Sequence, residues 1–211
     1  MMSSDFGKRD TMISKALSYI LRHGAIKENL EIDSLGYVKA DQLLNHNRLK
    51  THKTTLDDIL RVVENNNKKR FTLMQKDNEL YICANQGHSM KEISDSTLKK
   101  LERNTIPSVI YHGTYINVLP QIISSGGLKK MGRNHIHFTT SGAISGIRHN
   151  ANILIYLDVE KCLDRGLNFF ESVNGVILSP GDENGCISWQ LFDKVVDTKR
   201  NKEIDINEFF K

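Results

Sequence analysis

The sequence predicts an α+β protein with a mainly helical N-terminal half and a C-terminal half rich in short strands. Apolar side chains recur at helical spacing in residues 12–23 and again in residues 54–67. After Pro107 the pattern changes to short runs of β-branched and aromatic residues separated by Gly, Asn and Ser. Since 211 residues suffice for two small domains, we predict one domain on each side of that change.

Three helices precede a hairpin in the N-terminal half. The first, residues 12–23, carries an apolar stripe that includes Leu17 and Leu21, and Arg22 points away from that stripe. Residues 33–46 indicate a turn, a short strand and a second helix. Residues 54–67 indicate a third helix, with an N-cap drawn from the two threonines and two aspartates at its start.

Residues 70–84 alternate in the manner of two short strands around Asp77 and Asn78, which predicts a β-hairpin. Three helices followed by a hairpin is the order of a winged-helix module. Such modules bind nucleic acid in many proteins and protein partners in many others, so this order alone decides no function. We assign residues 1–92 to this domain and the polar, charged residues 93–106 to a linker.

The C-terminal domain, residues 107–211, reads as a small α+β unit. Strands are expected within 108–114, 135–140, 152–159 and 175–180. A helix is expected within 115–127, beginning late because Pro120 suits a first turn, and a shorter one within 141–150.

Composition narrows the class of protein. The formal net charge is +4, which permits an anionic partner without requiring one. The three cysteines are far apart and form no C-x-x-C pair, so neither a disulfide framework nor a zinc ribbon is indicated. We find no secretory signal pattern and no run of transmembrane length, and we therefore expect an intracellular protein, cytoplasmic or nuclear, with no membrane partner.

Four short basic or histidine-containing stretches could carry chemistry, and each has a structural alternative. Arg22 and His23 could bind a phosphate, or could simply complement the dipole of a helix that ends at Gly24 as its C-cap. The stretch 68–70 could bind an anion or enter a strand as a solvated basic turn. Residues 85–89, with an amide, a flexible Gly, an imidazole and a hydroxyl, could form an anion-binding loop or equally a turn after a strand. The fourth stretch is residues 132–137.

The chemistry that these stretches favour involves a phosphate. No candidate pair of catalytic carboxylates is evident, and neither a G-x-G-x-x-G, a Walker loop nor a G-x-S-x-G occurs. The imidazoles of His135 and His137 would share one face of a strand, but no carboxylate or cysteine accompanies them at ligand spacing, so we expect no metal. A site rich in Arg and His suits a reaction in which an anionic phosphate needs orientation and charge stabilisation more than a general base.

Six motifs in order resemble the RNA 2′-phosphotransferase family, which includes the tRNA 2′-phosphotransferase of fungal tRNA splicing. They are SKALSYILRHGA, IDSLGYV, KKRF, ANQGHS, YHGT and GRNHIHF, and the resemblance spans roughly residues 12–197 and is closest to the yeast-like branch. The resemblance implies a winged-helix RNA lobe and a C-terminal lobe of ADP-ribosyltransferase type. It also implies transfer of an internal RNA 2′-phosphate to NAD, through an ADP-ribosylated RNA phosphate, with ADP-ribose 1″,2″-cyclic phosphate, nicotinamide and 2′-hydroxyl RNA as products.

The resemblance assigns roles to residues whose positions match the family motifs. The implied catalytic residues are Arg22, His23, Arg70 and Arg133; the implied RNA and phosphate contacts are Lys68, Gln86, His88 and Ser89; the implied NAD contacts are His112, Gly113, Thr114 and Arg133. One position departs from the family pattern, because many members carry Arg where this chain has Cys83. Any contact made by that arginine is absent here, while the four catalytic positions are intact.

Two other functions fit the same sequence. One is a non-catalytic winged-helix protein that binds nucleic acid and carries a nucleotide-binding second domain. The other is an ADP-ribosyltransferase that modifies phosphate ends of nucleic acid and stops there. The resemblance favours the phosphotransferase, and we expect a monomer whose partners are NAD and a 2′-phosphorylated RNA such as ligated tRNA.

Overall fold

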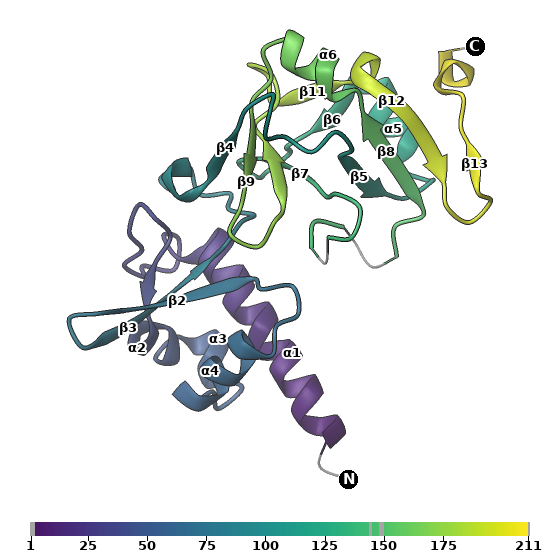
Figure 1. Cartoon of the computed structure of the whole chain (residues 1–211). Helices are drawn as coiled ribbons and strands as arrows, with labels where there is room; N and C mark the ends of the chain where they lie inside the picture. Colours follow the sequence, from purple (N-terminus) through teal and green to yellow (C-terminus); the bar gives the residue numbers. More distant parts are fainter. Residues whose placement is uncertain (1–2, 144, 148–149, 211) are drawn as a thin grey trace. The chain divides into compact units, whose positions relative to one another are not determined.

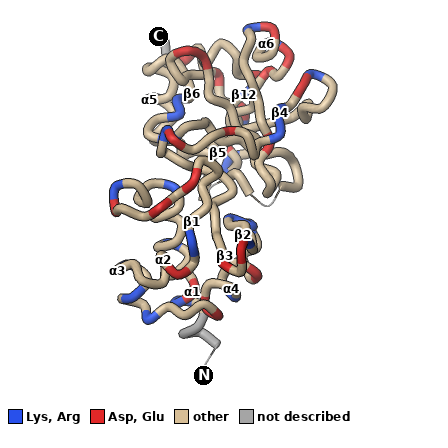
Figure 2. The backbone as a smooth tube through the Cα atoms, turned by 90° about the vertical axis from the view of Figure 1, so that its left-hand side faces the viewer, with Lys and Arg blue, Asp and Glu red and all other residues tan. Residues whose placement is uncertain are grey.

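The computed structural model describes residues 3–143, 145–147 and 150–210 and confirms the α+β class (Figure 1). The chain forms two compact units, residues 1–97 and 98–211, each with a hydrophobic core of its own. Lys and Arg are interspersed with Asp and Glu along the backbone of both units (Figure 2). Among the described helices, none is both long enough and apolar enough to span a bilayer.

The first unit contains the predicted helices and hairpin, together with elements that the sequence did not indicate. Its antiparallel sheet has the strand order β1-β3-β2. The elements are α1 (Ser3–Tyr19), a π-helical turn (Ile20–Gly24), β1 (Val38–Lys39), α2 (Ala40–Leu44), α3 (Asn47–Lys50), α4 (Leu56–Glu64), β2 (Phe71–Lys76) and β3 (Glu79–Ala84).

The elements that the sequence predicts best are those whose ends are determined by neighbouring residues. Helix α4 begins with a capping box in which the Thr55 hydroxyl accepts from the Asp58 backbone N–H and the Asp58 carboxylate accepts from that of Thr55. The β2–β3 hairpin turns at Asp77 and Asn78, which have φ values of 50° and 61°, the left-handed conformation that a two-residue hairpin loop needs. Both predictions are confirmed.

The core of the first unit gathers the apolar face of α1 with residues of the sheet and the shorter helices. Ile13, Leu17, Ile20 and Leu21 are fully buried in it. Helix α1 is also held to α4 by charge, because Arg9 donates to both Asp58 carboxylate oxygens at 2.7 and 2.5 Å. Arg22, which the pattern predicts to point away from the apolar stripe, is half-buried, and its Nε and Nη2 atoms are shielded from solvent.

The second unit is built mainly of antiparallel strands. Two four-stranded sheets have the orders β4-β9-β10-β7 and β13-β12-β8-β5, and β11 pairs with β6. Phe138 and Phe169 are the largest fully buried side chains of its core. The strands are β4 (Lys99–Leu101), β5 (Tyr111–Thr114), β6 (Gly127–Lys129), β7 (Ile136–Phe138), β8 (Ile153–Leu157), β9 (Phe169–Glu171), β10 (Ile177–Ser179), β11 (Cys186–Ser188), β12 (Phe192–Asp197) and β13 (Lys202–Glu203); the helices are α5 (Leu119–Ser124) and α6 (Val159–Asp164), and short 3₁₀ turns lie at Asp95–Thr97, Trp189–Leu191 and Ile206–Phe210.

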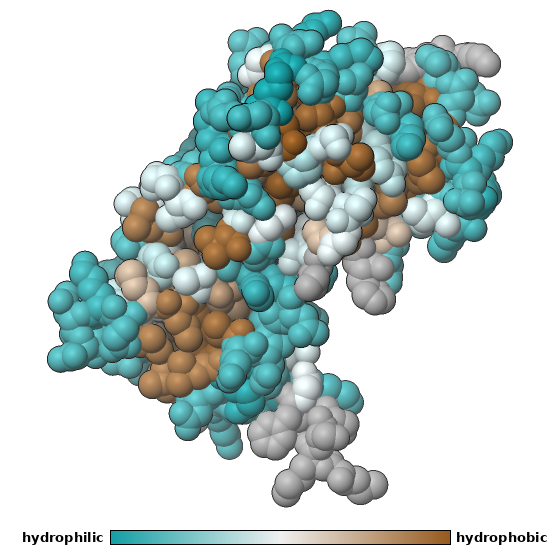
Figure 3. Space-filling model, viewed as in Figure 1, coloured by the Kyte–Doolittle hydropathy of each residue, from teal (hydrophilic) through white to brown (hydrophobic). Residues whose placement is uncertain are grey.

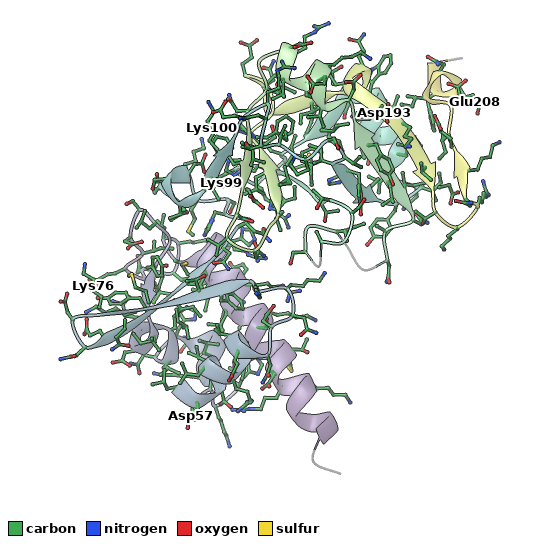
Figure 4. The ribbon with its side chains drawn as sticks, in the orientation of Figure 1. Asp57, Lys76, Lys99, Lys100, Asp193 and Glu208 are labelled. Carbon is green, nitrogen blue, oxygen red and sulfur yellow. The ribbon has the colours of Figure 1, made fainter. Side chains whose placement is uncertain are left out.

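Two expectations for this part of the chain need correction. The stretch 93–106 is not a plain linker, because Ile93 packs in the first core and β4 pairs with β9. Figure 4 shows Lys99 and Lys100 on β4. Because these two lysines are consecutive, the sequence of this strand lacks the alternation of polar and apolar residues that would predict it. Residues 141–150 form turns and bends where they are described, not a helix; residues 144, 148 and 149 of that prediction lie outside the described residues. Helix α5 begins at Leu119 with Pro120 in its first turn, as predicted.

Apolar side chains also reach the surface of both units (Figure 3). On α4, Leu56 and Leu60 are four residues apart and more than a third exposed. Scattered exposed apolar residues are ordinary in a folded protein and carry no argument for function here.

Candidate functional site

The chain at Arg22 and His23 is wound as a π turn rather than as a final α turn. The Ala25 N–H donates to the carbonyl of Ile20 at 2.9 Å, one residue further back than in an α-helix. Arg22 is half-buried and His23 exposed, while the residues on either side of the pair, Leu21 and Gly24, are buried. The extra residue in the turn presents two consecutive polar side chains beside the core, which the apolar periodicity alone did not predict.

Gly24 does not close the helix as a left-handed C-cap, so that reading of the sequence is wrong. Its φ is not positive, and the chain continues from it into further turns. What this position needs is the absence of a side chain, because a Cβ on Gly24 would lie 2.7 Å from Cε1 of Tyr19. Arg22 and His23 can complement the helix dipole and also bind a phosphate.

The loop at residues 85–89 meets this turn directly. The Ser89 N–H donates to the Arg22 carbonyl at 2.9 Å, and Ser89 Oγ lies 2.9 Å from His23 Nδ1 and 3.4 Å from the same carbonyl. With the Ser89 hydroxyl donating to that carbonyl, His23 donates from Nδ1 and its Nε2 is the nitrogen directed elsewhere. The structure thus brings together three of the residues that the sequence selected from two separate motifs.

Gly87 lets this loop lie over the Arg22 side chain. Its φ is +91°, in the region that favours glycine, and a Cβ there would meet Cδ and Nε of Arg22 at 3.4 Å. His88 lies against a different turn, because its Nε2 would be 3.2 Å from a Cβ on Gly36, whose φ is also positive. The loop therefore lies against Arg22 through Gly87 and against the turn before β1 through His88.

Asn85 joins the same loop to the basic stretch at residues 68–70, a role that the sequence did not indicate. This buried amide donates from Nδ2 to the Lys69 carbonyl at 2.7 Å and accepts at Oδ1 from the Thr72 hydroxyl at 2.6 Å. Its backbone N–H donates to the Arg70 carbonyl at 2.9 Å. We call these hydrogen bonds, which join Asn85 to the basic stretch, the Asn85 latch. The only sign of them in the sequence is an amide residue followed closely by a flexible Gly.

Arg70 and Lys68 are both half-buried on this turn, and Gln86 follows Asn85 with similar exposure. Arg70 donates from Nη1 to Oδ1 of Asn66 at 3.0 Å, and burial lowers the pKa of its guanidinium from the ordinary value. A partly desolvated guanidinium holds an anion more strongly than a fully hydrated one, because the local dielectric is lower.

Cys83 is structural. It is buried on β3 opposite Thr72. Burial raises the pKa of the Cys83 thiol, and burial beside that thiol raises the pKa of Tyr37 to about 12. A thiol in this environment is a poor nucleophile.

The second unit holds the remaining predicted residues. On β5, the His112 Nδ1 lies 2.8 Å from the carbonyl oxygen of His137. A carbonyl oxygen can only accept, so the N–H at Nδ1 donates to it. A Cβ on Gly113 would collide with the side chain of Ile147, which would have to move. Thr114 is buried, and its carbonyl accepts from Asn152 N–H at 3.0 Å.

Arg133 is exposed in the turn that precedes β7, where its N–H donates to the Lys130 carbonyl at 3.1 Å. His135 and His137, beyond it, are both buried, and the His135 ring meets Phe170 edge-on at 6.2 Å. Among the residues that the structure describes, no three His, Cys, Asp or Glu side chains gather in a manner that could hold a metal ion. The expectation of a metal-free reaction stays a prediction.

Comparison with known proteins agrees with the motifs on which the resemblance rests. Residues 8–181 match the model of a family described as RNA 2′-phosphotransferase, Tpt1 / KptA family. The chain is 45% identical to a tRNA 2′-phosphotransferase of Saccharomyces cerevisiae over 199 residues, 90% of this chain and 84% of the relative. It is 40% identical to tRNA 2′-phosphotransferase 1 of Danio rerio over 88% of this chain and 85% of the relative, and 36% identical to the human protein of that name over 92% and 79%. A family model that covers most of the chain, with relatives of this similarity aligned over most of their length, places the protein in the Tpt1 / KptA family of RNA 2′-phosphotransferases.

Proposed function

We propose that this enzyme removes an internal 2′-phosphate from RNA, at the splice junction of ligated tRNA, and transfers it to NAD. The observation that carries the proposal is the meeting of Arg22, His23 and Ser89, which the hydrogen bonds of Ser89 hold in one place. Ser89 joins the backbone of Arg22 to the ring of His23. A guanidinium and an imidazole from consecutive residues supply donors suited to phosphate oxygens. The names of the relatives supply the identity of the anion.

We propose that the first unit is the RNA lobe, of winged-helix type. Support comes from its element order, in which three short helices, α2 to α4, lie between β1 and the β2–β3 hairpin of one antiparallel sheet. The loop at 85–89 and the turn at 68–70 share the Asn85 latch, so Lys68, Arg70 and Gln86 are available to the same anion as Arg22. In this scheme His88 binds RNA beside the phosphate.

We propose that the second unit is the NAD lobe, of ADP-ribosyltransferase type. NAD is a substrate here, and the residues of β5 fit a ribose or carboxamide group. Because His112 donates from Nδ1 to a backbone carbonyl, its neutral ring offers Nε2 as an acceptor for a hydroxyl or amide hydrogen. Gly113 and Thr114 would contribute backbone, and Arg133, exposed in its turn, would contact the phosphate that is transferred.

The proposed reaction has two steps. An oxygen of the RNA 2′-phosphate forms a bond to C1″ of the nicotinamide ribose, and the glycosidic bond breaks with its electron pair leaving on nicotinamide. The 2″-hydroxyl of the ADP-ribose then forms a bond to phosphorus, and the bond between phosphorus and the RNA 2′-oxygen breaks. That oxygen gains a proton as the 2″-hydroxyl loses one. In this scheme Arg22, Arg70 and Arg133 stabilise the charge on the phosphorus centre, and His23 supplies an imidazole, a group that can exchange a proton near neutral pH.

Incubation of the purified protein with 2′-phosphorylated RNA and NAD tests this function. We expect 2′-hydroxyl RNA and ADP-ribose 1″,2″-cyclic phosphate in equal amounts, with full activity in the presence of a chelator. A reaction that ends at ADP-ribosylated RNA would make the enzyme an ADP-ribosyltransferase of nucleic acid. RNA binding without turnover would favour the non-catalytic module, and activity lost in chelator but restored by a divalent ion would refute the metal-free scheme.

A further inference from the structure

Tyr19 is the last residue of α1 and lies against the ring of His23. The two ring centroids are 6.3 Å apart, with the planes tilted by 58°. Tyr19 is half-buried and packs against the core of the first unit, whereas His23 is exposed. A half-buried ring beside an exposed one restricts the positions that the exposed ring can adopt.

A guanidinium lies on the Tyr19 ring as well. Arg48, from α3, places its Cζ 4.0 Å from the Tyr19 ring centroid. This is a close cation–π contact, of a kind that holds an aromatic ring in place. Helix α3 is one of the elements that the sequence did not indicate, so this contact appears only in the fold.

Arg48 is itself held in place by Glu28 and His46. Its Nε donates to Glu28 Oε1 at 3.3 Å, and His46 Nε2 lies 2.6 Å from Glu28 Oε2. The backbone N–H of Arg48 donates to His46 Nδ1 at 3.3 Å, so one neutral tautomer of His46, with its proton on Nε2, satisfies both contacts. The carboxylate of Glu28 thus receives two donors, both from the start of α3.

We propose that Tyr19 is a positioning residue for His23, and that Arg48, anchored by Glu28 and His46, keeps the Tyr19 ring in place. The inference rests on the proposed role of His23 at the substrate phosphate. On this view Ser89 fixes which nitrogen of His23 is protonated, and Tyr19 fixes where the ring lies. Gly24 belongs to the same arrangement, because a Cβ there would occupy the place of the Tyr19 ring.

Single-turnover rates and melting curves for Tyr19→Phe and Tyr19→Leu provide the first test. Tyr19→Phe keeps the ring and should stay within about threefold of the parent, since the face that the guanidinium contacts is unchanged. Tyr19→Leu should lower kcat on the order of tenfold to a hundredfold, the effect of misplacing a reacting group by about an ångström. The KM for NAD should not change.

Tyr81→Leu is the matched control for stability. Tyr81 is also half-buried in the first unit, with a cation, Lys39 Nζ, 6.0 Å from its ring centroid, but it is not in contact with His23. Tyr81→Leu should lower the melting temperature with little loss of kcat. An equal loss of kcat in both leucine variants would refute a specific role for Tyr19.

Arg48→Ala keeps the proposal testable if Tyr19→Leu folds poorly, because Arg48 is exposed. We expect a loss of about two- to fivefold in kcat, the effect of removing one exposed cation–π contact. Lys50→Ala, which removes an exposed charge from the same helix, is the control and should leave kcat unchanged. Arg48→Ala with parental kcat would refute the supporting role of α3.

A double-mutant cycle and a spectroscopic readout separate this inference from the proposed role of His23. In the His23→Ala background, Tyr19→Leu should cost nothing further, because its effect passes through the imidazole. The carbon-bound ring protons of His23, assigned by their absence in His23→Ala, should shift in Tyr19→Leu as the neighbouring ring is removed. Unshifted protons or additive losses would overturn the inference, whereas full activity of His23→Ala would overturn the role of His23 itself.

Discussion

Replacing Arg22 with alanine distinguishes a side chain aimed at substrate from one that completes a helix. The backbone carbonyl of Arg22 keeps both contacts with Ser89 after truncation, so the link between the π turn and the loop survives. The folded state loses, among other contacts, the packing of a half-buried aliphatic stem beneath Gly87.

The stability cost follows from that stem. Three methylenes at about 0.8 kcal/mol each would contribute roughly 2.4 kcal/mol if fully buried, so a half-buried stem contributes about 1 kcal/mol. That corresponds to a fall in melting temperature of roughly 4 °C. The catalytic cost should be far larger, because loss of one preorganised donor to a developing anion costs on the order of 10²–10³ in rate, or about 3–4 kcal/mol.

The assay is a single-turnover time course that separates 2′-phosphorylated RNA, ADP-ribosylated RNA and dephosphorylated RNA, with a melting curve for each variant. Arg22→Ala should accumulate the ADP-ribosylated intermediate, because an anionic nucleophile still supports the first step. Arg22→Lys should rescue only partly, since an ammonium cannot form the bidentate fork to phosphate. Lys15→Ala, an exposed basic residue of α1, is the control and should match the parent. Loss of activity explained entirely by the unfolded fraction would reduce Arg22 to a structural residue.

Three further predictions concern Ser89 at the site, the buried thiol of Cys83 and the contact between α1 and α4. Ser89→Ala should slow turnover about tenfold and flatten the pH dependence of kcat, because His23 loses the hydroxyl that selects its tautomer; an unchanged pH profile would refute this. Cys83→Ser should leave turnover within about threefold of the parent, because burial raises the pKa of that thiol and keeps it unreactive; a loss as large as that of the arginine variants would indicate a reactive thiol. Asp58→Asn should cost roughly 2–4 kcal/mol at neutral pH, from the capping bond and the charged hydrogen bonds together. Because Arg9 holds the pKa of Asp58 well below its usual range, this stability is present above the unfolded pKa of about 3.9 and is lost as pH falls below it, so urea titrations of the variant should show a smaller loss on acidification to pH 3 than those of the parent.

Local sequence patterns alone predict much of the secondary structure of this protein. The apolar stripe of α1, the capping box at Thr55 and the hairpin turn at Asp77 involve residues within a few positions of one another. Propensity, side-chain periodicity and turn chemistry act over that range, so the sequence suffices. The six motifs in order also identify the family, because each motif is defined by its residue types and their spacing.

The arrangement of the candidate site depended on contacts that no local pattern contains. His23 and Ser89 are 66 residues apart, and the latch formed by Asn85 and the ring contact between Arg48 and Tyr19 are also long-range. The π turn at the end of α1 carries the Arg22 carbonyl that accepts from Ser89 in the 85–89 loop. The boundary between residues 97 and 98 falls just before β4, which pairs with β9. The sequence by itself determined the family, the fold class and the residue types of the site. Tertiary structure decided which of those residues meet and what supports them, because such pairings are selected by packing of the whole unit rather than by neighbours in the chain.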